Sequence, residues 1–244
     1  MKVWLWLAIV FLAASGPFVE LSAQTSQRQS PRRLRVVIDA SHDGGVWWFP
    51  QVTQFDPGLP HQGSPLAEHL RGRGWEVIEV PRGTKIANQF RGASIVVRLN
   101  LSRGYEDSDV AAYQRFVKNG GRLLLIEGYV RDEEANKDSV ARLFGVRFEG
   151  VVREPVIDRV VAGTVMQGIG HLGFQIGSIV VAYPKSTQPL AYLSNDRLVM
   201  GTFRFGRGRI IFLGSVFPVL YVSQPFTKRL FDELAGPHLS KRKR

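Results

Sequence analysis

Short apolar runs alternate with segments of helical periodicity through the first half of the chain. This pattern predicts the order β-α-β-β-α-β-α between residues 34 and 145. The expected strands are 34–38, 75–80, one within 90–99 and 122–126, and the expected helices are 66–73, one that runs to 117 after a cap at Asp107 or Ser108, and 136–144. Alternation of this kind implies an α/β fold with a parallel sheet and helices on both faces.

The pattern changes at Val146, where short strands separated by glycine or proline turns replace the alternation. We expect strands at 146–161, 176–182, 190–193, 197–205 and 209–213, and a closing helix at 226–234. They predict antiparallel β additions in the C-terminal half, which return to the main sheet at 210–213. Gly206-Arg207-Gly208 is typical of a tight hairpin turn and lacks the helix and Lys-Ser/Thr pair of a phosphate loop.

The N-terminus has the pattern of a secretory signal peptide. Lys2 precedes an apolar run over residues 3–14, which is too short to span a bilayer, and Ala23 offers a cleavage site. An uncleaved membrane anchor is the alternative. The expected organisation is a signal peptide at 1–23, a flexible lead-in at 24–33, a single domain at 34–236 and a basic tail at 237–244. We therefore expect a secreted or periplasmic protein with no transmembrane span in the mature chain.

The cysteine content excludes two kinds of covalent modification, and the distribution of charge argues against one class of partner. The net charge is +11 and the chain contains no cysteine, so neither a disulfide framework nor a lipid-modified N-terminal cysteine is available. The excess charge is spread out, apart from the basic tail, and no recognisable nucleic-acid motif is present. We expect no nucleic-acid partner.

Four motifs carry a family resemblance. They are Asp39-Ala-Ser-His42, Glu68-His-Leu-Arg-Gly-Arg-Gly74, the unit from Glu106 to Gly121, and Phe205-Gly-Arg-Gly208-Arg-Ile-Ile-Phe-Leu-Gly214. With them the chain resembles the class I glutamine-amidotransferase-like superfamily over nearly all of 34–236. It looks most like uncharacterised extracytoplasmic and trehalose-utilisation-type members. The resemblance implies a flavodoxin-like fold.

The chain departs from this superfamily at the position of the nucleophile. Its amidotransferases carry a Gly-x-Cys-x-Gly turn after the fourth strand, whereas this chain has Ile126-Glu127-Gly128-Tyr129. Glutamate cannot form the thioester intermediate, and no cysteine exists elsewhere to replace it. Glutamine amidotransferase activity is therefore excluded, and no residue is assigned a catalytic role.

Candidate ligand-binding residues follow the first and fourth strands, whose carboxyl ends share one edge of a parallel sheet. They are Asp39, His42, Asp43, Trp47, Trp48, Glu127 and Tyr129. Trp47 and Trp48 lie in a long irregular segment and offer faces for stacking on a sugar. The structural alternative for Asp39 is a turn cap that accepts local backbone N–H groups. His61, His69 and His171 are expected to be structural, with His69 exposed.

The resulting expectation is a non-catalytic domain that binds a carbohydrate, another cell-envelope component or a protein partner, with no cofactor or metal. The alternative is a hydrolase of carbohydrate-like substrates that uses Glu127 with Asp39 or His42, either as an acid–base pair or through a metal.

Overall fold

The computed structural model describes residues 33–39, 41, 63–80, 84–99, 105–128, 138–169, 172–220 and 225–236. All of them lie in one compact unit of the chain. The expected signal peptide, the lead-in up to residue 32 and the basic tail lie outside these residues. Within the described ranges, none of the helices could cross a membrane.

Strands and helices alternate in the first half of the chain, as expected. The elements are β1 (Arg35–Asp39), α1 (Gly63–Gly72), β2 (Glu76–Val80), the 3-10 helix η2 (Ile86–Gln89), β3 (Ile95–Leu99), α2 (Asp107–Lys118), β4 (Arg122–Ile126) and α3 (Ser139–Leu143). The second half is mostly strands. Its elements are β5 (Arg147–Val156), β6 (Arg159–Val160), β7 (Gly173–Ala182), β8 (Gln188–Leu193), the 3-10 helix η3 (Ser194–Asp196), β9 (Arg197–Phe205), β10 (Gly208–Leu213), α4 (Phe217–Leu220) and α5 (Phe226–Ala235).

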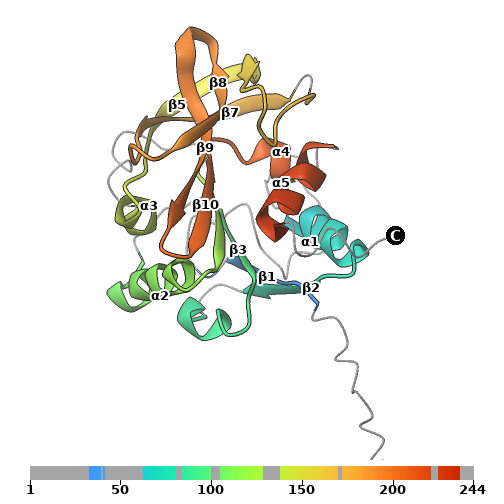
Figure 1. Ribbon diagram of the computed structural model, residues 1–244, viewed down its shortest axis with the longest axis vertical. Helices are drawn as coiled ribbons and strands as arrows, with labels where there is room; N and C mark the ends of the chain where they lie inside the picture. Colours follow the sequence, from blue (N-terminus) through green and yellow to red (C-terminus); the bar gives the residue numbers. More distant parts are fainter. Residues whose placement is uncertain are drawn as a thin grey trace, which may run out of the picture. The chain divides into compact units, whose positions relative to one another are not determined.

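Among the described residues, eight strands form one sheet in the order β2-β1-β3-β4-β10-β9-β8-β6 (Figure 1). The first five strands pair in parallel, and β9, β8 and β6 continue the sheet in antiparallel fashion. The parallel part has the flavodoxin-like order, in which the direction of winding reverses between β1 and β3. The expected α/β class, the antiparallel additions and the return of 210–213 to the main sheet are confirmed.

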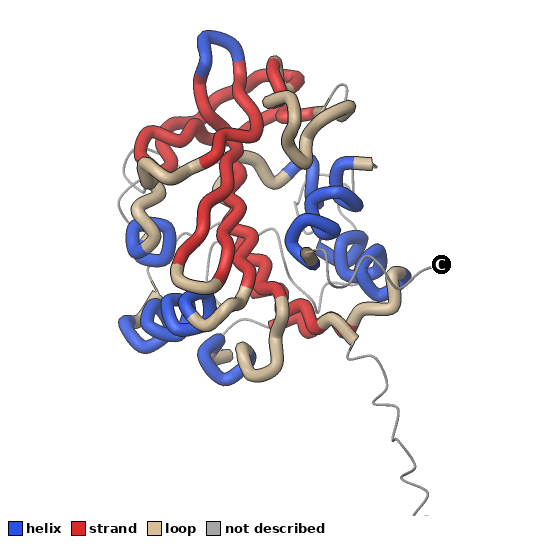
Figure 2. The backbone as a smooth tube through the Cα atoms, viewed as in Figure 1, coloured by secondary structure: helices blue, strands red, loops and turns tan. Residues whose placement is uncertain are grey.

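Helices cover both faces of the parallel strands, with α1 and α5 on one side and α2 and α3 on the other (Figure 2). The central positions of β1, β3, β4 and β10 are mostly apolar because both faces of these strands are buried. Ile38 of β1 belongs to the core cluster that contains Leu66 of α1. Its neighbour Val37 points the other way and packs in the cluster that contains Tyr113 of α2.

The expected single strand at 146–161 is wrong. It is two strands, of which β5 pairs with β7 in a separate two-stranded sheet and β6 joins the main sheet. The change of partner occurs between them. The backbone N–H of Ile157 donates to Leu172, whereas that of Asp158 donates to Tyr192 on β8.

Two smaller expectations also fail. The N-cap of α2 is Glu106, in an extended conformation and without a capping side chain, so Asp107 lies inside the first turn. There an acidic side chain is stabilised by the helix dipole. His69 of α1 is half-buried rather than exposed. Burial, and the charge of Arg73, lower the pKa of His69.

The hairpin expected at Gly206-Arg207-Gly208 joins β9 to β10. Gly206 has a φ of +59°, and a Cβ atom there would lie 2.8 Å from the backbone oxygen of Lys118. Glycine is therefore required by both the backbone conformation and the close approach to α2.

Candidate functional site

Three ionisable side chains lie on one face of the sheet at its carboxyl edge. Asp39 ends β1 and is the register partner of Arg98 in β3. Arg98 is paired in turn with Leu125 of β4, and Glu127 follows two positions later. Because alternate residues of a strand point to the same face, Asp39, Arg98 and Glu127 all lie on the face covered by α2 and α3. They sit at and beside the point where the winding of the sheet reverses.

Arg98 holds two carboxylates together. Its Nη2 donates to Glu127 Oε1 at 2.6 Å and lies 2.8 Å from Asp138 Oδ2 as an ion pair. The other oxygen of Asp138 accepts a hydrogen bond from the backbone N–H of Ala141 and caps α3. The side chain of Arg98 is 0% exposed and that of Glu127 is 4% exposed. One buried guanidinium thus joins β3, β4 and the start of α3.

Asp39 is held by a second set of donors. Its Oδ1 accepts hydrogen bonds from the backbone N–H and the hydroxyl of Ser41, at 2.9 and 2.6 Å. Its Oδ2 accepts from the hydroxyls of Tyr105, at 2.7 Å, and of Tyr113 on α2, at 2.5 Å. The turn-capping role considered for Asp39 is therefore confirmed. Four donors therefore satisfy both side-chain oxygens of this buried residue.

The two sets are in contact. The rings of Tyr105 and Tyr113 pack edge to face, with centroids 5.5 Å apart, and Arg98 Cζ lies 5.9 Å from the Tyr105 centroid. We call Asp39, Arg98, Tyr105, Tyr113, Glu127 and Asp138 the carboxyl-edge cluster.

Burial controls the protonation of the cluster. Burial raises the pKa of Glu127 well above the usual value. The charge of Arg98 opposes this rise, and the nearby Asp138 adds to it. Burial and the charge of Asp39 raise the pKa values of Tyr105 and Tyr113, so both phenols keep the protons that they donate. Burial works against the charge of Arg98, but its carboxylate neighbours prevail and raise its pKa.

Some buried N–H groups of the carboxyl-edge cluster have no hydrogen-bond partner among the described residues. Within the described part of the chain, Arg98 Nε and Nη1 are buried without a hydrogen-bond partner. Leaving a buried donor unpaired costs about 1–3 kcal/mol. These two N–H groups are therefore the polar atoms of the cluster that an oxygen acceptor would satisfy.

The structure brings together two of the expected site residues. Asp39 and Glu127 lie on the same edge with Arg98 between them. His42, Asp43, Trp47, Trp48 and Tyr129 lie outside the described residues, and so do His61 and His171. The connections that follow β1, β3 and β4 leave from this edge and run through 40, 42–62, 100–104 and 129–137, which are not described.

Sequence reasoning missed Arg98, Tyr105, Tyr113 and Asp138 as members of the site. Arg98 carried a usable signal, because it is the one charged residue in the apolar strand Ile95-Val-Val-Arg-Leu99. Tyr113 appeared to be an ordinary core position on its helix. In the described residues, no group of three acidic, histidine or cysteine side chains is arranged to hold a metal ion.

Comparisons with known proteins found similar folds but no similar sequences. No family model matches the chain, and no curated protein is similar enough to count as a relative. Among solved structures, the mmIFT52 N-terminal domain is similar with a TM-score of 0.65 and 14% identity, over 83% of this chain and 98% of that one. The cytoplasmic protein STM3548 from Salmonella typhimurium has a TM-score of 0.57 and 15% identity, over 82% and 96%.

A third structure is a larger enzyme. The exo-β-1,4-mannosidase Op5Man5 from Opitutaceae bacterium strain TAV5 has a TM-score of 0.50 and 16% identity, and the likeness covers 83% of this chain but only 34% of the enzyme. At such low identity these likenesses show a shared fold and no shared activity.

Proposed function

We propose that this chain is a secreted or periplasmic, non-catalytic domain of amidotransferase-like ancestry. Its ligand site lies at the carboxyl edge of the sheet, above the carboxyl-edge cluster, and its ligand is a carbohydrate or another component of the cell envelope. The observation that carries the proposal is the buried pairing of Glu127, at the nucleophile position, with Arg98.

The location follows from topology. In open α/β sheets, ligands bind outside the carboxyl ends of the strands where the winding reverses. In this chain that point lies between β1 and β3, where Asp39 and Arg98 are register partners.

The absence of catalysis follows from how the acids are held. Asp39 accepts four hydrogen bonds, and Glu127 is paired with Arg98. Neighbouring strands are about 4.8 Å apart, so β1 and β4 are separated by about 10 Å, with Arg98 between them. The carboxyl groups of Asp39 and Glu127 are thus occupied by partners within the fold.

The choice of a carbohydrate rests on the sequence. The segment after β1 contains Trp47 and Trp48, whose rings suit stacking on sugars, and the N-terminal segment predicts export.

The test is a thermal-shift and calorimetric screen of the mature chain against neutral and amino-sugar oligosaccharides. We expect one sugar class to raise the melting temperature without being cleaved. Trp47→Ala should abolish this shift, and Tyr183→Ala should leave it unchanged, because Tyr183 is 44% exposed and lies between β7 and β8. A screen in which no saccharide binds would contradict the proposal, and capture of a protein partner instead would redirect it.

The second candidate is a carboxylate-based hydrolase. One observation favours it, since the raised pKa of Glu127 is what a general acid needs near neutral pH. The same screen separates the two candidates if products are analysed. Cleavage that is lost in Glu127→Gln would establish the hydrolase, whereas binding that survives in Glu127→Gln without products would establish the binding domain.

A further inference from the structure

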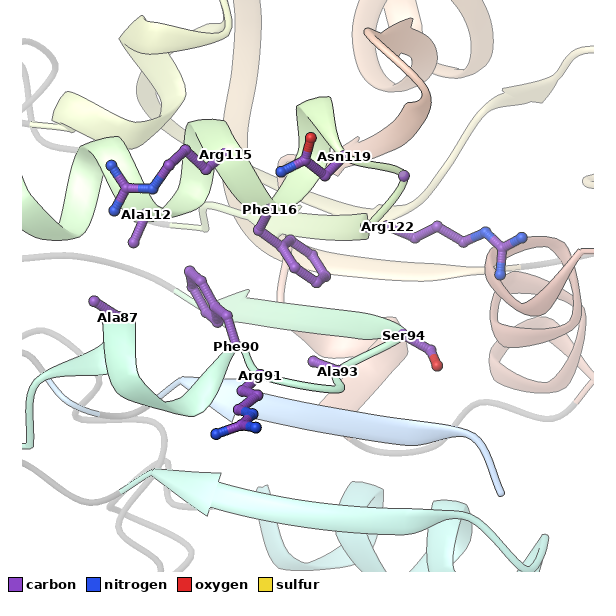
Figure 3. A pocket seen from close by; sticks show the side chains of 12 residues that line it. Ala87, Phe90, Arg91, Ala93, Ser94, Ala112, Arg115, Phe116, Asn119 and Arg122 are labelled. Atoms are coloured by element: carbon purple, nitrogen blue, oxygen red, sulfur yellow. The ribbon is translucent and has the colours of Figure 1, made fainter. Parts of the chain in front are cut away.

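A second site lies at the opposite, amino edge of the same sheet. There a pocket of about 560 Å³ opens between η2 and the C-terminal part of α2 (Figure 3). Its walls are formed by residues that precede β3 and by the turn that leads into β4, so it shares no residue with the carboxyl-edge cluster.

The base of the pocket is aromatic. Figure 3 shows Phe90, which follows η2, and Phe116, on α2, pointing toward one another between the two walls. Their ring centroids are 5.1 Å apart, and Phe90 also packs edge to face on Tyr113, at 4.9 Å. Phe90 and Phe116 are both half-buried, so each keeps part of a ring surface open to the pocket.

The turn after α2 shapes this base. A Cβ atom at Gly121 would lie 2.4 Å from the Phe116 ring. Only glycine lets the ring fold against the backbone at this point. The Asn119-Gly120-Gly121 sequence therefore does more than end a helix, because it sets the position of one aromatic wall.

The rim of the pocket is cationic. Arg91 and Arg115 lie on opposite walls, and Figure 3 shows their guanidinium groups directed away from each other, with the Phe90 ring between them. Both are exposed, and neither forms an ion pair in the described structure. No acidic residue lines the pocket. A third lining arginine, Arg122, is committed elsewhere, because its Nη1 donates to the backbone oxygen of Ala235 at 2.7 Å.

A second pocket at this edge differs because its lining contains acidic residues as well as arginines. It has a volume of about 530 Å³ and is lined by Arg209 and Arg229 together with Asp232 and Glu233. Arg209 pairs with Glu233 there, and Arg229 donates to the backbone oxygen of Gln167. The cations of the first pocket have no such partners, so they remain available to a ligand.

We propose that the pocket between η2 and α2 binds a small ring that carries a carboxylate or a phosphate. The ring lies against Phe90 and Phe116, and the oxyanion faces the rim, where the exposed side chains of Arg91 and Arg115 supply positive charge. Guanidinium groups suit this role because they stay charged and donate two parallel hydrogen bonds to an oxyanion. Two sources supply this chemistry, a uronic acid or phosphorylated sugar and an aromatic acid. The proposal is independent of the carboxyl-edge site.

The test is calorimetric titration of the mature chain with matched pairs of compounds. Glucuronate is compared with glucose, benzoate with benzamide, and inorganic phosphate serves as an anion without a ring. We expect the charged member of at least one pair to bind about tenfold or more tightly than its neutral partner, since a charge-assisted hydrogen bond contributes that much to affinity. The pair that responds identifies the source.

Variants locate the binding. Arg91→Gln and Arg115→Gln should each weaken the charged ligand by about tenfold, and Phe90→Leu should weaken the ring-bearing anions but not inorganic phosphate. Arg147→Gln is the matched control, because Arg147 is exposed at the start of β5, forms no ion pair in the described structure and removes the same charge. Equal affinity for charged and neutral members would overturn the proposal. So would equal affinity of the Arg91→Gln, Arg115→Gln and Arg147→Gln proteins, or binding of phosphate as tight as that of the ring-bearing anions.

Discussion

The two edges of one parallel sheet use arginine in opposite ways. At the carboxyl edge, Arg98 is fully buried and paired with Glu127 and Asp138. At the amino edge, Arg91 and Arg115 are exposed at the rim of an aromatic pocket and have no acidic partner among the lining residues. The comparison teaches that burial decides the role of a charge. A buried arginine must be neutralised by the fold and becomes part of its framework, whereas an exposed, unpaired one keeps its charge for a ligand.

The largest expected loss of stability comes from removing the buried arginine at the carboxyl edge. Arg98→Met leaves Glu127 and Asp138 buried without their cation, and removing one partner of a buried pair costs about 3–5 kcal/mol. Equilibrium unfolding in urea measures this loss. Arg115→Met serves as the exposed control. If both variants lost the same small amount of stability, the contrast between the two edges would be wrong.

A smaller effect is expected at Asp39. Tyr113→Phe removes one of the hydroxyls that donate to its carboxylate, and hydrogen bonds to charged groups contribute about 1.5–3 kcal/mol. Tyr183→Phe is the control, because that side chain is exposed. Urea unfolding should rank Tyr113→Phe between Arg98→Met and the control. A loss no larger than that of Tyr183→Phe would mean that the fourth donor is dispensable.

The pH dependence of stability probes Glu127 alone. An unfolded glutamate loses its proton near about pH 4.3, whereas folded Glu127 keeps its proton to a higher pH because its pKa is raised. Over that interval the folded state binds more protons, so the contribution of Glu127 to stability falls as pH increases.

The difference between the wild type and Glu127→Gln, followed by urea unfolding across pH 4–8, should therefore shift in favour of the variant as pH increases, because glutamine does not titrate. A difference that stays constant with pH would contradict the raised pKa.

The smallest expected effect is on the exposed side. Arg91→Gln and Arg115→Gln should change stability by no more than about 0.5 kcal/mol, as is usual for surface substitutions. Thermal unfolding of both proteins provides the check. Losses of several kcal/mol would mean that these arginines are structural, and the amino-edge pocket would then need another explanation.

Much of the fold follows from the sequence because its signals are local. Apolar strands such as Leu123–Ile126 and helices ended by Gly74 and Gly121 leave few alternatives to a parallel sheet. The shared edge of Asp39 and Glu127 also followed from strand order alone. The split of 146–161 did not, because it depends on the distant partners Leu172 and Tyr192.

The clusters were harder to predict because they depend on contacts between distant residues. Arg98 meets Asp138, 40 positions later, only through the packing of α3 on the sheet. Arg91 and Arg115 flank one ring only because η2 and α2 lie side by side. Besides the single charge in the strand of Arg98, strand parity could have identified the cluster, since Val37 and Asp39 alternate in step with Val96 and Arg98.

The measurement that tests the account most directly is a double-mutant cycle between Arg98 and Glu127. Unfolding free energies are compared at pH 7 for the wild type, Arg98→Met, Glu127→Gln and the double variant. We predict that the sum of the stability losses in the two single variants exceeds the loss in the double variant by about 1–3 kcal/mol, as is usual for residues in one buried network. Losses that add to within about 0.5 kcal/mol would show that the two side chains are energetically independent, and the carboxyl-edge cluster would not be the framework described above.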